Sequence, residues 1–74
     1  MRPAIATGAR VTDDRLFVVL SDGREISVPL ADYPRLMNAT PAERRKWEIT
    51  DFGTALRWPD IDEDIGVAGV LGVP

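Results

Sequence analysis

The strongest structural signal in this chain is the stretch RLFVVLSDGREISVP, residues 15–29. Residues 16–20 are strand-forming hydrophobics, and residues 25–28 alternate between polar and apolar. Asp22-Gly23 between them is a pair typical of hairpin turns. Pro29 ends the second strand because proline cannot donate a backbone hydrogen bond. The stretch therefore predicts an antiparallel β-hairpin.

Two registers of this hairpin compete. A two-residue loop, Asp22-Gly23, places Phe17 and Val19 opposite apolar residues of the second strand. A three-residue loop, Ser21–Gly23, pairs residue 18 with 26 and 16 with 28, and collects five apolar side chains on one face: Leu16, Val18, Leu20, Ile26 and Val28. We favour the second, because register follows the face that can be buried.

In the favoured register Phe17 and Val19 lie on the reverse face of the hairpin. That face then needs cover from another chain or from a terminus of this one. We therefore expect a homodimer.

Short elements are expected on both sides of the hairpin. Residues 3–13 alternate loosely and predict an edge strand that ends in an Asp13-Asp14 turn. Short helical segments are expected near residues 33–47, the first beginning near Tyr33 because Pro34 suits a first turn. Thr40 and Glu43 have the spacing of a capping box for the second. The basic triplet that follows is interpreted as a solvated helix face: Arg44, Arg45 and Lys46.

The C-terminal third predicts two further strands and a helical turn. Alternating residues near 47–58, divided at Gly53, predict a second antiparallel pair. Trp47 and Trp58 are interpreted as core anchors. Residues 67–71 predict a short helical turn. Together these elements predict an α+β fold with a small antiparallel sheet, in one domain spanning residues 1–74.

Composition excludes several functions. The 74 residues contain no cysteine and no histidine, which removes thiolate chemistry, the commonest general base and the commonest metal ligand. A net charge of −3 disfavours nucleic acid as a partner. No apolar run suits a signal peptide or a membrane span. We expect a cytoplasmic protein without a cofactor.

The densest charge lies in WPDIDEDI, residues 58–65, which contains four carboxylates. This segment is the candidate partner-binding site, formed by Trp58, Asp60, Asp62, Glu63 and Asp64. The acids have two interpretations: Asp62 or Asp64 caps the terminal helical turn, or the cluster steers a basic partner. We expect Ile61 and Ile65 to point inward.

The acidic segment does not match a known metal motif. Counted from Asp60, the turn glycine of a calcium loop falls on Ile65 and its closing glutamate on Leu71. No catalytic, cofactor-binding or metal-ligating residue is therefore assigned. A small metal-assisted enzyme using these carboxylates stays open as the alternative function.

An ordered set of short motifs supports a family resemblance. They are SDGR at 21–24, VPL at 28–30, YPRL at 33–36, AT at 39–40, Trp47 and LRWPDIDEDI at 56–65. From about residue 11 to residue 71 the chain resembles a small bacterial family of unknown function, number twenty-four forty-two (DUF2442). The resemblance implies a compact α+β domain, with no established catalytic residue to transfer. Relatives that bind DNA do so through a following helix-turn-helix domain, which we do not expect in a sequence that ends at Pro74.

The resemblance also implies a two-gene arrangement suggestive of toxin and antitoxin. We therefore expect a non-catalytic protein-interaction module, the antitoxin-like half of such a pair, with a protein partner encoded nearby. A nucleic-acid-binding or regulatory domain is the least favoured of the alternatives.

Overall fold

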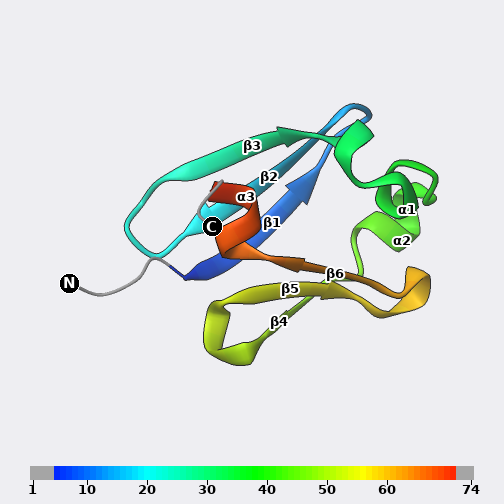
Figure 1. Cartoon of the computed structure of the whole chain (residues 1–74). Coiled ribbons are helices and arrows are strands. Elements are labelled where there is room, and N and C mark those ends of the chain that lie inside the picture. The colour runs from blue at the N-terminus through cyan, green and yellow to red at the C-terminus, as the bar shows by residue number, and fades with distance from the viewer. Residues whose placement is uncertain (1–4, 72–74) are drawn as a thin grey trace.

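The structure is a computed structural model that describes residues 5–71, in which two three-stranded antiparallel sheets are joined by short helices (Figure 1). Sheet A consists of β1 (Ala6–Val11), β2 (Arg15–Leu20) and β3 (Glu25–Pro29). Sheet B consists of β4 (Glu48–Thr50), β5 (Ala55–Trp58) and β6 (Glu63–Gly66). The α-helices are α1 (Pro34–Met37), α2 (Pro41–Arg44) and α3 (Val67–Leu71), and the 3-10 turns are η1 (Leu30–Asp32), η2 (Asp51–Gly53) and η3 (Pro59–Ile61). The α+β fold class is confirmed.

The central hairpin adopts the favoured register. Leu16 pairs with Val28 and Val18 with Ile26. The Leu20 amide donates to the Arg24 carbonyl at 2.8 Å, which closes the three-residue loop. Gly23 has φ +92°, a conformation that glycine adopts without steric cost. The observed register is therefore the one that collects the apolar side chains on the face that can be buried, as expected.

The strand expected at the N-terminal edge is β1, which among residues 5–71 pairs with β2 alone. Its register shifts between Ala6 and Gly8, an irregularity common at sheet edges. The Thr12 amide donates to the Arg15 carbonyl and closes the Asp13-Asp14 turn. Residues 3 and 4 of the expected strand lie outside the described residues.

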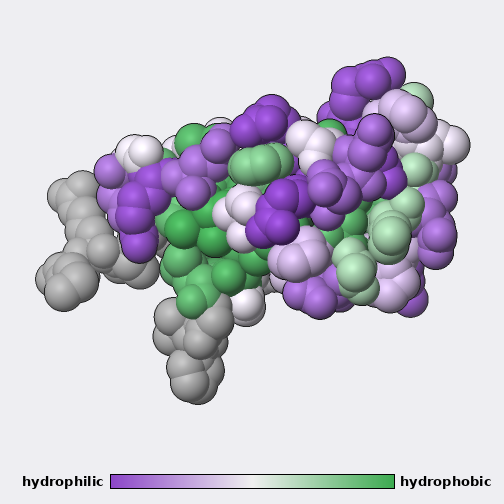
Figure 2. All heavy atoms as spheres, turned by 90° about the horizontal axis from the view of Figure 1, so that it is seen from above, coloured by the Kyte–Doolittle hydropathy of each residue, from purple (hydrophilic) through white to green (hydrophobic). Residues whose placement is uncertain are grey.

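The core lies between the two sheets. Every second residue of β2 is buried, and Trp58 of β5 is fully buried opposite them. The remaining core side chains come from all parts of the chain: Ala6, Leu30, Leu36, Leu56, Ile65, Val67 and Val70. Full burial of each large side chain contributes about 1.5–3 kcal/mol. Seen from above, hydrophobic residues also reach the surface toward the centre-left of the view (Figure 2).

The reverse face of sheet A finds cover within its own chain. The Arg10 guanidinium lies 4.0 Å from the centre of the Phe17 ring, a cation–π contact. The same guanidinium forms an ion pair with Glu25 at 3.2 Å. Phe17 is half-buried beneath this contact, and Val19 on the same face is half-buried as well. A second chain is therefore not required to cover Phe17, and the homodimer stays a prediction.

The middle of the chain follows the capping signals. The α1 helix begins at Pro34, directly after Tyr33. The Thr40 hydroxyl accepts from the Glu43 amide at 3.1 Å, and the Glu43 carboxylate accepts from the Thr40 amide at 2.8 Å. The predicted capping box is confirmed. Within the described residues, no helix has the length and apolar character needed to cross a membrane.

The second antiparallel pair predicted after residue 47 is β4 with β5, and β6 completes it as a separate sheet B. The capping interpretation of the acids was wrong. Asp62 and Asp64 do not cap the terminal helix, since β6 occupies residues 63–66 and α3 begins at Val67. Ile65 on β6 is buried, and Ile61 is half-buried against the core. The predicted inward direction of both side chains is confirmed.

Candidate functional site

The candidate site predicted from the sequence surrounds the turn between β5 and β6. The Trp58 side chain is fully buried, and its indole N–H donates to the Arg44 carbonyl at 3.0 Å. The indole is thus a core anchor, as the sequence suggested. Its assignment to a partner-binding surface was wrong, because the side chain is not exposed. Pro59–Ile61 form η3, and Asp62 ends this turn in the left-handed conformation, φ 53°. The exposed part of the candidate site reduces to the four acids.

Three of these acids form ion pairs with basic side chains of the same chain. Asp62 lies 3.3 Å and Asp64 4.0 Å from the Arg57 guanidinium. Asp60 lies 3.4 Å from the ammonium of Lys46. Arg57 and Asp64 are direct cross-strand partners, so the ion pair supports the register of β6. The cluster is therefore a surface ion-pair network in which the acids outnumber their basic partners.

The remaining acid of the predicted site, Glu63, is half-buried and accepts from the Asp64 amide at 3.0 Å. The Arg35 guanidinium donates to the backbone carbonyl of Asp62. Among residues 5–71, no three acidic side chains come together in a group that could hold a metal ion. The four acids thus form contacts that stabilise the β5–β6 turn and the pairing of β5 with β6. Their role in partner binding stays a prediction.

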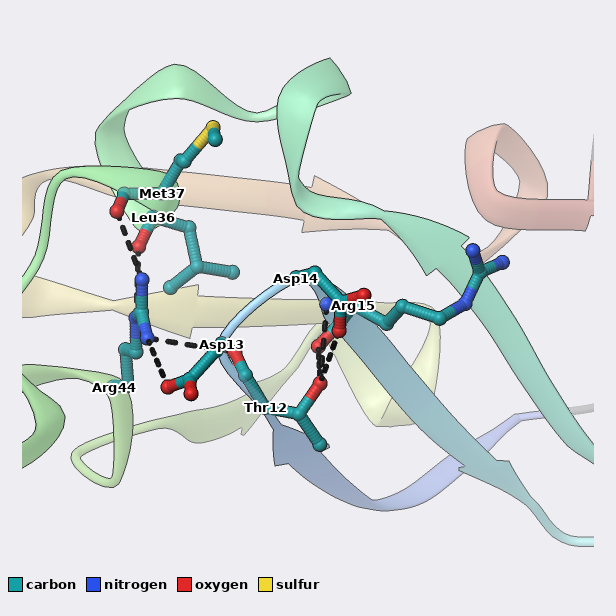
Figure 3. Close-up of polar contacts among 7 residues, drawn as sticks. All are labelled: Thr12, Asp13, Asp14, Arg15, Leu36, Met37 and Arg44. Atoms are coloured by element: carbon teal, nitrogen blue, oxygen red, sulfur yellow. Dashed lines mark hydrogen bonds and ion pairs between the residues drawn. The ribbon is translucent and has the colours of Figure 1, made fainter.

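Arg44 has a structural role that the sequence did not indicate. Its guanidinium donates to the carbonyls of Met37 at 2.8 Å, Leu36 at 3.2 Å and Thr12 at 3.4 Å (Figure 3). The carboxylate of Asp13 lies 4.0 Å away. Only 13% of the Arg44 side chain is exposed. Arg44 therefore joins the end of α1 to the β1–β2 turn, and the solvated-face interpretation of the basic triplet was wrong at this position.

A cleft of about 540 Å³ lies beside Arg44. Its volume falls in the range of about 300–1,000 Å³ typical of ligand sites. It is lined by consecutive residues of β1, by the β1–β2 turn, by α2 and by the segment after it: Ala9, Arg10, Val11, Asp13, Pro41, Arg44, Arg45 and Trp47. These residues come from two stretches far apart in the sequence, 9–13 and 41–47, so no local sequence pattern could have indicated the cleft.

A second unexpected feature is the η2 turn that joins β4 to β5. Asp51, Phe52 and Gly53 follow one another with φ angles of 52°, 58° and 90°. The left-handed conformation is uncommon for any residue except glycine, and for a bulky aromatic it is an outlier. The Phe52 side chain is fully exposed, at 101% of its reference surface. The sequence had placed Phe52 in a strand, whereas β4 ends at Thr50.

The η2 turn is held in place by its surroundings. A side chain at Gly53 would lie 2.8 Å from the Cβ of Ile5, so the backbone of the turn packs directly on residue 5. The Thr54 amide and hydroxyl both donate to the Asp51 carbonyl, at 3.1 and 2.7 Å. Close to the turn, Ile49 on β4 is 43% exposed. An aromatic and an aliphatic side chain are thus presented to solvent at one end of sheet B.

Comparisons with known proteins identify relatives but no activity. The family model described as "Protein of unknown function (DUF2442)" matches residues 6–72. A crystal structure of a protein of unknown function from Rhodospirillum rubrum ATCC 11170 is similar to this chain, with a TM-score of 0.81 and 25% sequence identity. The likeness covers 97% of this chain and 90% of that one. No curated protein matches.

Proposed function

This chain belongs to the DUF2442 family of proteins of unknown function, and we propose that it is a non-catalytic protein-interaction module. The observation that carries the proposal is Phe52, a fully exposed aromatic on a turn with two left-handed non-glycine residues. Each such residue costs about 1–2 kcal/mol. Backbone strain of this kind persists where the surrounding structure imposes it, and it concentrates at functional sites.

The contact surface in this proposal is the apolar pair Phe52 and Ile49. Aromatic side chains dominate binding energy when they enter a pocket of a partner. Asp51 is exposed directly before Phe52 in the turn, so an acid borders the pair. A partner that offers an apolar pocket with a basic border matches this surface. The four acids at the β5–β6 turn add long-range attraction for the same kind of partner.

The partner in this proposal is a small protein encoded nearby, with this chain as the antitoxin-like half of the pair. Its expected cytoplasmic location is part of the same proposal. No observation specifically favours the metal-assisted alternative, since Asp60, Asp62 and Asp64 are already in ion pairs. The nucleic-acid alternative loses one of its three candidate cations, because Arg44 is engaged with backbone carbonyls.

The proposal is tested by co-expressing the tagged chain with the protein of the adjacent gene and measuring co-purification. We expect recovery of the neighbour, and loss of that recovery in Phe52→Ser. Met37→Ser is the matched control, because Met37 is 48% exposed and lies outside the η2 turn. Equal recovery with Phe52→Ser and wild type contradicts the assigned surface.

A charge-reversal variant separates the acidic network from the apolar pair. Asp62→Lys, Glu63→Lys and Asp64→Lys together remove three of the four acids. If these acids steer the partner, the reversal lowers the association rate and makes that rate less sensitive to salt. Unchanged association kinetics remove these acids from the proposed surface. Because the same change breaks the ion pairs of Arg57, circular dichroism of the variant checks that the fold is intact.

A further inference from the structure

The cleft beside Arg44 presents the backbone of β1 to a ligand. Three consecutive residues of this strand, Ala9 to Val11, line it. Side chains alternate between the two faces of a strand, so three in a row can share one cleft only if its wall is the strand edge. Within the described residues β1 pairs with β2 alone. This edge therefore has unpaired N–H and C=O groups that an extended segment can use.

The cleft also carries positive charge on a chain whose net charge is −3. Three of its lining residues are arginines, but two are already engaged. The Arg44 guanidinium binds backbone carbonyls, and that of Arg10 contacts Glu25 and Phe17. The exposed Arg45 side chain has no hydrogen bond or ion pair to any residue between 5 and 71. Arg45 is the cation left for a ligand.

The remaining wall is apolar. Trp47 is half-buried, and its ring edge is 3.9 Å from where a side chain on Gly8 would begin. Pro41 contributes a second rigid apolar surface. The one acid in the lining, Asp13, lies 4.0 Å from the Arg44 guanidinium, so its charge is partly offset. A strand edge, an apolar wall and one available guanidinium thus converge on the same space.

We propose that this cleft binds an extended acidic peptide segment of a partner protein. The segment adds to the free edge of β1, an apolar side chain rests on Trp47, and a carboxylate is bound by Arg45. Arginine suits this role because its planar guanidinium can bind a carboxylate through two hydrogen bonds. The proposal rests on the interaction function above but uses a surface that shares no residue with Ile49 and Phe52.

The test is a selection of random hexapeptides displayed on phage, with the whole chain as the immobilised target. We expect enriched sequences with an aspartate or glutamate next to apolar residues. A synthetic enriched peptide should bind Arg45→Glu about tenfold more weakly or worse, the effect of losing one charge-assisted hydrogen bond. Arg45→Lys should retain part of the affinity. Arg24→Glu is the matched control, since Arg24 is exposed and follows the turn at the other end of β2.

Nuclear magnetic resonance locates the bound peptide. We expect shifts of the amides of residues 9–11 and of the Trp47 indole, and a constant indole signal from the buried Trp58. No enrichment, enrichment without acids, or equal binding to Arg45→Glu overturns the proposal. So does stronger binding of inorganic phosphate or of a single-stranded oligonucleotide at the same amides, which would assign the cleft to those ligands. Phe52→Ser should leave peptide affinity unchanged, so each of the two proposals can fail without the other.

Discussion

Arg44 shows how one side chain can hold several elements together. Its guanidinium satisfies two carbonyls at the end of α1, and its own carbonyl accepts from the Trp58 indole. Removing the guanidinium takes away charge-assisted hydrogen bonds to these carbonyls, and a hydrogen bond to a charged group contributes about 1.5–3 kcal/mol. The position is therefore important for stability.

Arg44→Ala is expected to lower the free energy of unfolding by about 1.5–3 kcal/mol. Urea denaturation followed by circular dichroism measures this change. Arg45→Ala, next to it, removes an exposed side chain and should change stability by less than about 0.5 kcal/mol. Similar losses in the two variants would mean that the contacts of Arg44 contribute little.

Tyr33 gives the chain an alkaline pH dependence. Partial burial, and then the charges of Asp32 and Glu63, raise the pKa of the Tyr33 phenol above its ordinary value. The folded state therefore holds this proton more tightly than the unfolded state does. The resulting stability is complete below the unfolded pKa of about 10 and is lost as the pH rises through the folded pKa.

Urea midpoints measured from about pH 8.5 to pH 11 test this dependence. Wild type should lose stability across that window relative to Tyr33→Phe, which cannot ionise at this position. Parallel curves for the two proteins would show that Tyr33 titrates with an ordinary pKa.

The η2 turn has a conformation that its residues do not favour. Glycine at position 52 would relieve about 1–2 kcal/mol of left-handed strain. It would also give the unfolded chain more freedom, at a cost of about 0.4–1 kcal/mol. Because the Phe52 side chain is fully exposed, its loss removes little buried surface. The balance favours the variant.

Phe52→Gly is therefore expected to stabilise the chain by about 0.5–1 kcal/mol while it abolishes the proposed partner contact. Thermal and urea unfolding measure the first effect, and co-purification measures the second. A less stable Phe52→Gly would show that the aromatic ring contributes to folding, and would remove the strain argument for function.

The β6 strand shows that tertiary partners can override local composition. Acidic residues are depleted in strands, and residues 63–66 contain two of them. The strand forms because Ile65 enters the core and Asp64 meets Arg57 across the ladder. Neither partner is adjacent in sequence, so the sequence alone indicates only that the acids cap a helical turn or steer a basic partner.

At the scale of the whole molecule, the sequence predicts a homodimer through the reverse face of β2. If it forms, light scattering at high concentration should give twice the chain mass of 8.2 kDa, and Phe17→Glu should restore the single mass. A constant mass of one chain at all concentrations is the contrary result. In a single chain, the Arg10 guanidinium already covers the Phe17 ring, which reduces the apolar surface that a second chain would bury.

Much of the fold was determined by the sequence alone, because the deciding interactions are local. The hairpin register follows from apolar alternation over fifteen residues and a glycine in the turn. The start of α1 and the capping box of α2 depend on residues no more than three positions apart. Such signals act within a turn or a strand pair, so they can be read without the rest of the chain.

Only the tertiary structure decided where the two sheets divide and which residues form surfaces. Trp58 moved from a candidate contact to the core, and Arg44 from a solvated face to a largely covered side chain that holds backbone carbonyls. The cleft combines β1, α2 and Trp47, and the exposure of Phe52 depends on how its turn packs on Ile5. These features arise from contacts between segments distant in sequence, whose proximity no local pattern encodes.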